Sequence, residues 1–404
     1  MSGLLNHPAT AAAARTGLVL TGGGARSAYQ VGVIGALARM LPRDAPSPFR
    51  IVTGMSAGAI VAAALACHAA RFRTGAIALE RVWRNFHCDQ VFRADTFSLL
   101  RVGLRWALAL ASAGRLVGAP ESVFDNSPLR ELLERRYDFG QMRAAMSAGH
   151  LDALAITASN YRTARSVAFF ESRVGAADRA DDWLRGMPTE LSVNHLLASS
   201  AVPFLFPATR LDGEHFGDGA MRQIAPLSPA IRLGADRLFI VGVRDAPASS
   251  AMIAVDRVPS PGIGQVLGFM LDTLFIDALP ASLVQLERLN RLIDQSAVPA
   301  PDGLRRIAPL VISPRASLSE IAARHARTMP RSVRALLRTF GIANVGGSEL
   351  LSYLLFESGY TRELIALGAA DARERRDELL SFIARAPAAA DDRPTRNDHR
   401  VAVA

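Results

Sequence analysis

Two segments near the start of the chain place a short apolar stretch, a glycine turn and a helical pattern in immediate succession. Residues 16–21 (TGLVLT) precede Gly22–Gly24, and residues 49–53 (FRIVT) precede residues 54–58 (GMSAG). A short apolar run fits a strand buried on both faces, and a glycine turn directly after it lets the chain enter a helix. This repeated order predicts an α/β protein built on a parallel sheet.

The same alternation extends through most of the chain. Further strands are predicted over residues 152–158, 166–170, 238–243 and 306–313. Helices are predicted over residues 27–40, from the end of the glycine turn 54–58 to about residue 70, and over residues 228–233. From about residue 263 the pattern turns helical, with segments at 264–274, 281–294, 318–327, 332–340, 347–356, 361–367 and 371–383. The sequence therefore predicts a three-layer α/β/α fold with a mostly parallel central sheet and a C-terminal helical extension.

Composition excludes several classes of protein. Half of the 404 residues are hydrophobic, so this is not a disordered charged tail. The net charge of +9 rests entirely on arginine, and aromatic residues make up only 6%, which argues against a base-stacking platform, so no nucleic-acid partner is expected. Cys67 and Cys88 have neither metal-ligand spacing nor the density of a disulfide scaffold, which favours a reducing, cytoplasmic compartment.

One stretch is long enough to span a membrane. Residues 51–70 carry no formal charge, but they open on Thr53, Gly54, Ser56 and Gly58, and their apolar content is mostly alanine. We interpret them as part of a soluble core. Residues 1–15 also lack the basic start and apolar centre of a signal peptide. We therefore expect a cytoplasmic protein without a transmembrane helix.

Two other segments could touch a lipid surface. Residues 98–112 (SLLRVGLRWALALAS) fit either an interfacial cap helix or a helix covering the sheet. Residues 315–338 hold six arginines against one acid, which fits peripheral contact with an anionic membrane or a solvated helical face.

The turn over residues 54–58 matches the pattern G-x-S-x-G between a strand and a helix. Such a turn lifts the Ser56 hydroxyl above the sheet edge, and Gly54 and Gly58 allow the strained turn and a close backbone approach. The pattern therefore makes Ser56 a candidate nucleophile. The alternative is a small-residue turn that only packs the helix on the strand.

The first glycine turn allows three interpretations. The amide groups of Gly22, Gly23, Gly24 and Ala25 could form an oxyanion hole, with Arg26 anchoring the loop or a substrate head group. A nucleotide site is opposed by the lack of a following G-K-[ST] and of the third glycine of G-x-G-x-x-G. A plain tight turn is the third interpretation.

Two later segments add candidates. In Asp218-Gly219-Ala220 an acid stands before a glycine at a strand end, which fits either a general base or an ordinary turn. Residues 198–207 (ASSAVPFLFP) join a small-residue helix end to a proline-bounded apolar loop, and alone they suggest a buried connection.

Together these four segments resemble the patatin-like phospholipase family. That family combines a glycine-rich oxyanion loop, a G-x-S-x-G serine, an A-S-x-A-x-P-x-x-F-x-P loop and a D-G-G/A motif. This chain has the corresponding residues in the same order at 22–26, 54–58, 198–207 and 218–220. It departs from the family at Ser27, where glycine is usual, and at Gln223, where asparagine often follows.

The resemblance implies a division of the chain into four parts. These are an N-terminal tail (1–15), a patatin-like catalytic domain (16–235), a region with the last strands and the C-terminal helices (236–385), and a tail expected to be disordered (386–404).

The resemblance also implies a function. It predicts a serine hydrolase of phospholipid, lysophospholipid or related acyl esters, in which Ser56 is the nucleophile and Asp218 accepts its proton. None of the eight histidines fits an α/β-hydrolase triad, and we expect His215 to be a strand residue. No metal or cofactor is expected, because no metal-ligand cluster is visible in the sequence. An acyltransferase with the same Ser–Asp dyad and a catalytically silent lipid-binding protein are the alternatives.

Overall fold

The computed structural model describes residues 15–93, 121–173, 184–244, 278–296, 304–339 and 348–384, with residues 104, 105, 108 and 112. Its strands are β1 (Thr16–Leu20), β2 (Ile51–Met55), β3 (Ala153–Asn160), β4 (Ser166–Ser172), β5 (Leu184–Pro188), β6 (Thr209–Leu211), β7 (Glu214–Gly217), β8 (Arg237–Val241) and β9 (Ala308–Ile312). The helices before β8 are α1 (Ala28–Met40), α2 (Ala57–Cys67), α3 (Phe72–Trp83), α5 (Ser127–Arg136), α6 (Phe139–Ser147), α7 (Val193–Ser199) and α8 (Ser228–Arg232). The helices after it are α10 (Leu279–Gln295), α11 (Leu318–His325), α12 (Arg331–Thr339), α13 (Ser348–Leu354), α14 (Ser358–Glu374) and α15 (Arg376–Ala384).

The strands form one mostly parallel sheet, which confirms the predicted fold class. The sheet order is β5-β4-β3-β2-β1-β8-β9, and β1 pairs in parallel with both β2 and β8. β3 and β9 extend this parallel centre on its two sides. β4 pairs antiparallel with β3, and the hairpin β6–β7 joins the end of β3 through β7. The central strands are buried on both faces, as their continuous apolar runs predict.

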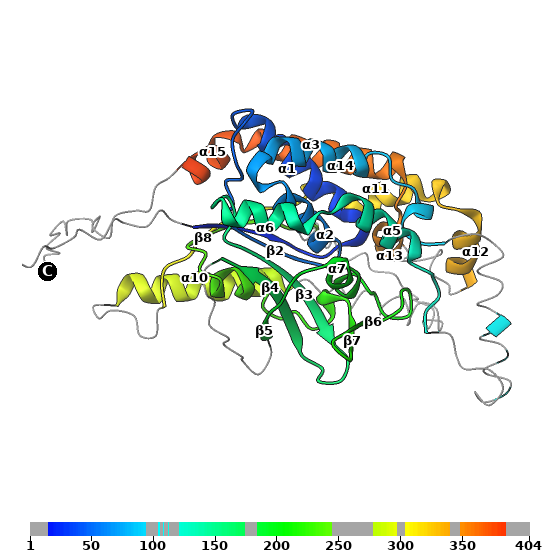
Figure 1. The fold of residues 1–404 in the computed structure, drawn as a ribbon. Coiled ribbons are helices and arrows are strands. Elements are labelled where there is room, and N and C mark those ends of the chain that lie inside the picture. Colours follow the sequence, from blue (N-terminus) through cyan, green and yellow to red (C-terminus); the bar gives the residue numbers. More distant parts are fainter. Residues whose placement is uncertain are drawn as a thin grey trace, which may run out of the picture.

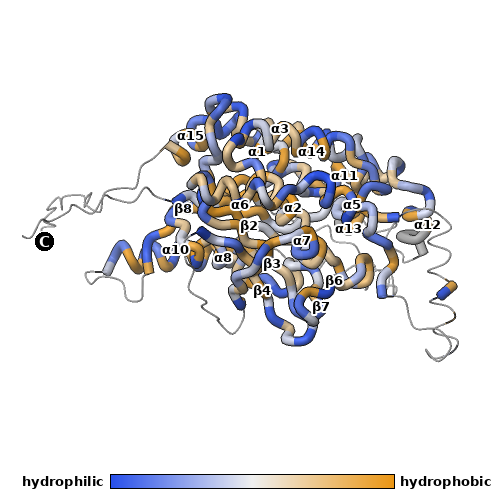
Figure 2. The backbone as a smooth tube through the Cα atoms, viewed as in Figure 1, coloured by the Kyte–Doolittle hydropathy of each residue, from blue (hydrophilic) through white to orange (hydrophobic). Residues whose placement is uncertain are grey.

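The sheet separates two apolar cores by the alternation of its side chains. Leu18 and Leu20 of β1 face the larger core, whereas Val19 faces the smaller one. Helices α1, α2, α3 and α14 cover the first face, and α10 lies across the other (Figure 1). Apolar colours concentrate along the sheet, while α10 alternates between apolar and polar residues (Figure 2). The strand period of two therefore produces the three layers.

Most of the predicted elements are present, with shifted ends. The helix predicted to reach residue 70 ends at Cys67, because the His68 ring bonds the carbonyl oxygen of Ala64 at 3.0 Å and closes the last turn. The segments predicted at 361–367 and 371–383 form the longer helix α14 followed by α15. The predicted helix 264–274, most of residues 98–112 and the tail 386–404 lie outside the described residues.

The C-terminal helices share the main core with the N-terminal half. Helix α14 crosses α1 at two glycines, Gly32 and Gly368. A Cβ atom on Gly32 would overlap the backbone of Ile365, and one on Gly368 would overlap the backbone of Tyr29. The two helices are therefore in direct backbone contact, and α14 forms part of the layer that covers the sheet.

In the described part of the chain, no single helix is long and apolar enough to cross a membrane. Helices α2 and α3 reach that length only when taken together, and they are bent by 70° at the break between them.

The crossing of α1 and α14 yields a prediction about stability. Gly32→Ala should lower the free energy of unfolding by roughly 1–3 kcal/mol through overpacking, although alanine favours helices. Gly35→Ala in the same helix is the matched control, because its Cβ would meet only the ends of the flexible side chains of Glu80 and Arg39. Urea denaturation of both variants tests this, and equal stability of the two would contradict the close crossing.

Candidate active site

The sheet register brings the predicted site segments together at one edge. Leu20 at the end of β1 pairs with Gly54 of β2, so the glycine loop after β1 lies beside the turn after β2. Met55 in turn pairs with Thr157 of β3. Strand β7 pairs with the end of β3, and Asp218 follows β7 directly. Parallel strands end at the same edge, which is where α/β proteins place their sites.

Ser56 occupies a strained turn between β2 and α2. Its backbone has φ 52° and ψ −133°, which a residue with a side chain rarely adopts. A Cβ atom on Gly54 would lie 2.5 Å from the carbonyl oxygen of Gly58, and one on Gly58 would lie 2.5 Å from that of Leu20. Only glycine therefore permits this close packing of strand on helix, and α2 directs its N-terminal dipole at Ser56.

Asp218 holds the Ser56 hydroxyl. The Ser56 Oγ donates a hydrogen bond to Asp218 Oδ2 at 2.6 Å, and the Ala220 N–H donates to Oδ1 at 2.8 Å. The two side chains are almost fully buried, with exposed fractions of 3% for Ser56 and 1% for Asp218. Burial raises the pKa of Asp218 to about 6, although the hydrogen bonds from Ser56 and Ala220 lower it.

A network of small polar groups fixes both residues. The Ser56 N–H donates to Ser199 Oγ at 2.8 Å, and that hydroxyl donates to the carbonyl oxygen of Thr157 at 2.6 Å. The Ser159 hydroxyl donates to the carbonyl oxygen of Asp218 at 2.8 Å, and a Cβ atom on Gly219 would overlap the Thr157 oxygen. Ser199 belongs to residues 198–207, for which sequence reasoning alone suggested no more than a buried connection.

The glycine loop packs directly against Ser56. A Cβ atom on Gly22 would lie 3.1 Å from the Cβ of Ser56, and Gly24 has φ +52°, which favours glycine. Within the described residues, the N–H groups of Gly23 and Gly24 donate to no other backbone group. Ala25 is buried behind the loop. The loop therefore presents amide donors beside the serine, as an oxyanion hole requires.

Arg26 connects this loop to the C-terminal helices. Its guanidinium donates to Ser352 Oγ at 2.6 Å and to Ser319 Oγ at 2.7 Å, and it lies 4.3 Å from the centre of the Tyr353 ring. Arg26 is 1% exposed. Of the two roles that the sequence left open, this geometry fits anchoring of the loop.

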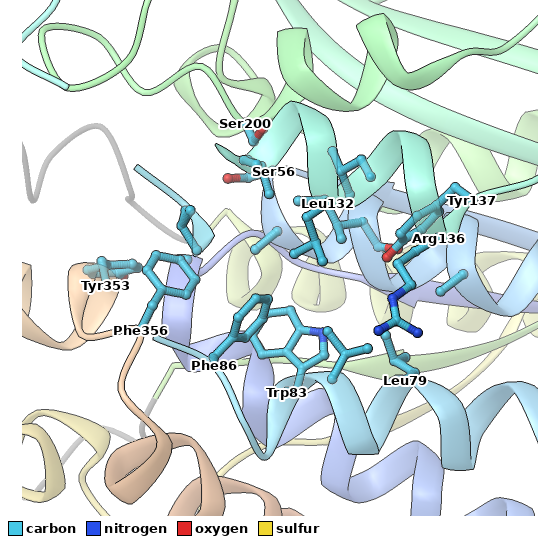
Figure 3. Close-up of a pocket in the computed structure, with 18 of the residues that line it drawn as sticks. Ser56, Leu79, Trp83, Phe86, Leu132, Arg136, Tyr137, Ser200, Tyr353 and Phe356 are labelled. Carbon is cyan, nitrogen blue, oxygen red and sulfur yellow. The ribbon is translucent and has the colours of Figure 1, made fainter. Parts of the chain in front are cut away.

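An apolar cavity of about 190 Å³ opens at Ser56. It runs between α2, α3 and α5, with Trp83 and Phe86 on one wall and Leu132 on another (Figure 3). Tyr353 and Phe356 flank it on the side of the C-terminal helices. Sequence reasoning missed this cavity, because the residues that line it come from six separate segments with no common motif.

Other predicted residues lie apart from this pair. His215 is an exposed residue of β7, as expected. Ser27 and Gln223, the two departures from the family pattern, are buried, and each has a side-chain polar atom without a partner in the part of the chain described. The described residues contain no cluster of three histidine, cysteine or acidic side chains that could hold a metal ion.

A three-layer α/β protein with a buried Ser–Asp pair at the carboxyl edge of its parallel strands is the class that this fold and site define. The model of the patatin-like phospholipase family matches residues 18–231, just over half of the chain. The chain belongs to this family.

Known proteins give further similarities. A cGAMP-activated phospholipase from Pseudomonas aeruginosa is 27% identical over 262 residues, which cover 64% of this chain and 66% of that protein. VipD from Legionella pneumophila aligns over 87% of this chain and 66% of its own, with 13% identity and a TM-score of 0.33. Human GIVD cytosolic phospholipase A2 with a methyl γ-linolenyl fluorophosphonate inhibitor aligns over 92% of this chain and 59% of its own, with 15% identity and a TM-score of 0.44. The chain thus spans about two thirds or less of each relative.

The buried carboxyl group predicts a pH effect on stability. A carboxyl pKa that folding raises from 3.8 to about 6 means that the folded state binds more protons between these values, so stability falls as pH rises through them. Relative to Asp218→Asn, the wild-type free energy of unfolding should drop by about 2 kcal/mol between about pH 4 and about pH 7. Urea denaturation of both proteins at both pH values measures this, and parallel pH profiles would contradict it.

Proposed function

We propose that this chain is a serine hydrolase of lipid acyl esters that uses Ser56 and Asp218 as a catalytic dyad. The observation that carries the proposal is the 2.6 Å hydrogen bond between the two side chains at the mouth of an apolar cavity. Membership of the patatin-like phospholipase family supports it.

In the acylation step, Ser56 Oγ attacks the ester carbonyl carbon while Asp218 Oδ2 takes the hydroxyl proton. A carboxylate is ordinarily a weak base, and the burial that raises the pKa of Asp218 to about 6 brings it closer to the pH of the reaction. The negative charge that develops on the carbonyl oxygen would be held by the N–H groups of Gly23 and Gly24 and by the N-terminus of α2.

The intermediate then collapses. The carbon–oxygen bond to the alcohol breaks, Asp218 returns its proton to the departing oxygen, and an acyl group remains on Ser56. Water attacks this acyl-enzyme while Asp218 accepts its proton. The bond from the acyl carbon to Ser56 Oγ then breaks, Asp218 returns the proton to that oxygen, and the fatty acid leaves. The reaction needs no redox partner, since it exchanges only acyl groups and protons.

The cavity beside Ser56 supports a lipid substrate. Its lining is dominated by leucine, valine and aromatic side chains, which would bury an acyl chain. The relative from Pseudomonas aeruginosa is named a phospholipase, which supports a phospholipid or lysophospholipid as the acyl donor.

Peripheral contact with an anionic membrane remains a proposal. Of the six arginines in residues 315–338, Arg315 pairs with Asp371 at 2.9 Å and Arg324 pairs with Glu363. These ion pairs leave fewer of the six guanidinium groups for lipid phosphates.

Transfer of the acyl group to an alcohol other than water would use the same two residues. Product analysis in the presence of glycerol or a lysophospholipid separates transfer from hydrolysis. A lipid-binding protein without catalysis would bind esters and release no fatty acid.

The first test removes the proposed nucleophile. Ser56→Ala should reduce hydrolysis of p-nitrophenyl esters by more than about a thousandfold, because the attacking oxygen is lost. Labelling by a fluorophosphonate probe, read by mass spectrometry, should locate the adduct on Ser56 in the wild type. Activity retained within about tenfold of wild type in a folded variant would refute the assignment.

The second test removes the proposed base. Asp218→Asn keeps the shape of the side chain but cannot accept the proton, so labelling of Ser56 should collapse, whereas His215→Gln should leave it nearly unchanged. In the wild type the labelling rate should fall about tenfold per pH unit below about pH 6, as Asp218 becomes protonated. The opposite outcome, loss in His215→Gln with retention in Asp218→Asn, would show that the base is a histidine.

A further inference from the structure

The cavity follows one face of helix α2 away from the serine. Ser56, Ile60, Ala64 and His68 all line it, and they are spaced by four residues, so they lie along a single stripe of the helix. At 1.5 Å of rise per residue, the twelve positions from Ser56 to His68 correspond to a length of about 18 Å. The cavity therefore extends about this far from Ser56 along α2.

Helix α3 forms the opposite wall and narrows the cavity towards His68. It lines the cavity from Gly75 to Trp83, and it is bent by 70° from α2 at the break after Cys67. A Cβ atom on Gly75 would overlap His68, so the two helices touch there. The walls thus diverge towards Ser56 and converge at His68.

The far end is also polar and open to water. Arg136 and Ala78 line it and are exposed, and Arg136 points along the wall beside Leu79 (Figure 3). An apolar chain that extended past this hydrated cation would bury no further apolar surface and would gain no binding free energy.

We propose that the cavity measures the acyl chain of the substrate, with His68 and Arg136 marking the limit of its length. This inference rests on the function proposed above and adds its chain-length preference. An extended hydrocarbon advances about 1.25 Å per carbon, given carbon–carbon bonds of about 1.5 Å, so about 18 Å holds about 14 carbons. Each methylene up to that limit is buried, and further methylenes meet water.

The expected signature is a break in a substrate series. For p-nitrophenyl esters from butanoyl to octadecanoyl, kcat/KM should rise by up to about fourfold per methylene and then level off near tetradecanoyl. Detergent-free, sub-micellar substrate concentrations keep chain length from acting through aggregation. A rise that continues unchanged to octadecanoyl would overturn the proposal.

A bulky residue two thirds of the way along the cavity should move the break to shorter chains. Ala64 lies eight positions from Ser56, about 12 Å along the helix, so Ala64→Phe should set the break near decanoyl. Ala70→Phe is the matched control, because Ala70 is exposed just beyond α2 and does not line the cavity. An unchanged break in a folded Ala64→Phe protein would contradict the proposal.

An apolar exit should move the break the other way. Arg136→Leu removes the cation at the open end, so the ratio of hexadecanoyl to tetradecanoyl hydrolysis should rise several-fold. If Ala64→Phe does not fold, Leu132→Trp narrows the cavity from α5 instead, and labelling of Ser56 by a short-chain fluorophosphonate reports whether each variant is folded.

A binding measurement separates this proposal from the catalytic one. In Ser56→Ala, displacement of a fluorescent fatty acid by free fatty acids should show the same break near tetradecanoate, and Ala64→Phe in that background should shorten it. If fatty-acid binding shows the break but neither the wild type nor any variant cleaves esters, the catalytic proposal fails and the proposed chain-length limit holds. If esters are cleaved but neither the affinity for fatty acids nor the rate of hydrolysis depends on chain length, only the proposed chain-length limit fails.

Discussion

The carboxyl group of Asp218 lies almost wholly out of water, and its recorded partners are a hydroxyl and a backbone N–H rather than a cation. Burying a charge in this way opposes folding, and the raised pKa measures that opposition. The surrounding structure supplies the compensation through the large apolar cores and through two bonds that hold the Asp218 backbone. The Ser159 hydroxyl donates to the Asp218 carbonyl oxygen, and the Asp218 N–H donates to the carbonyl oxygen of Ala201. The same cost makes the carboxylate a stronger base.

Much of this arrangement could be predicted from the sequence, because it depends on local patterns. The apolar runs before Gly22 and Gly54 define strands buried on both faces, and parallel strands must end at one edge. Ser56 could therefore be placed beside the glycine loop without coordinates. Asp218 required the family resemblance, since an Asp-Gly pair is by itself an ordinary turn.

The remaining features depend on contacts that leave no periodic trace. Arg26 donates hydrogen bonds to Ser319 and Ser352, which lie about three hundred residues further along the chain. No sequence pattern around Arg26 or around the two serines predicts these contacts. The cavity is equally absent from any sequence pattern, because Trp83 of α3 and Tyr353 of α13 come to line one cavity only in the folded chain. Sequence periodicity predicts which face of a helix is buried but not which helix covers it.

The pairing of β1 with β8 also limits how this protein can be divided. The strand that carries the glycine loop is flanked on one side by β8, which begins at Arg237, beyond the stretch that matches the family model. A fragment ending at residue 231 would expose a row of unpaired backbone groups along β1 and leave α1 without α14. The stretch that matches the family model is therefore shorter than the unit that packs together, which extends from the first strand to the last helices.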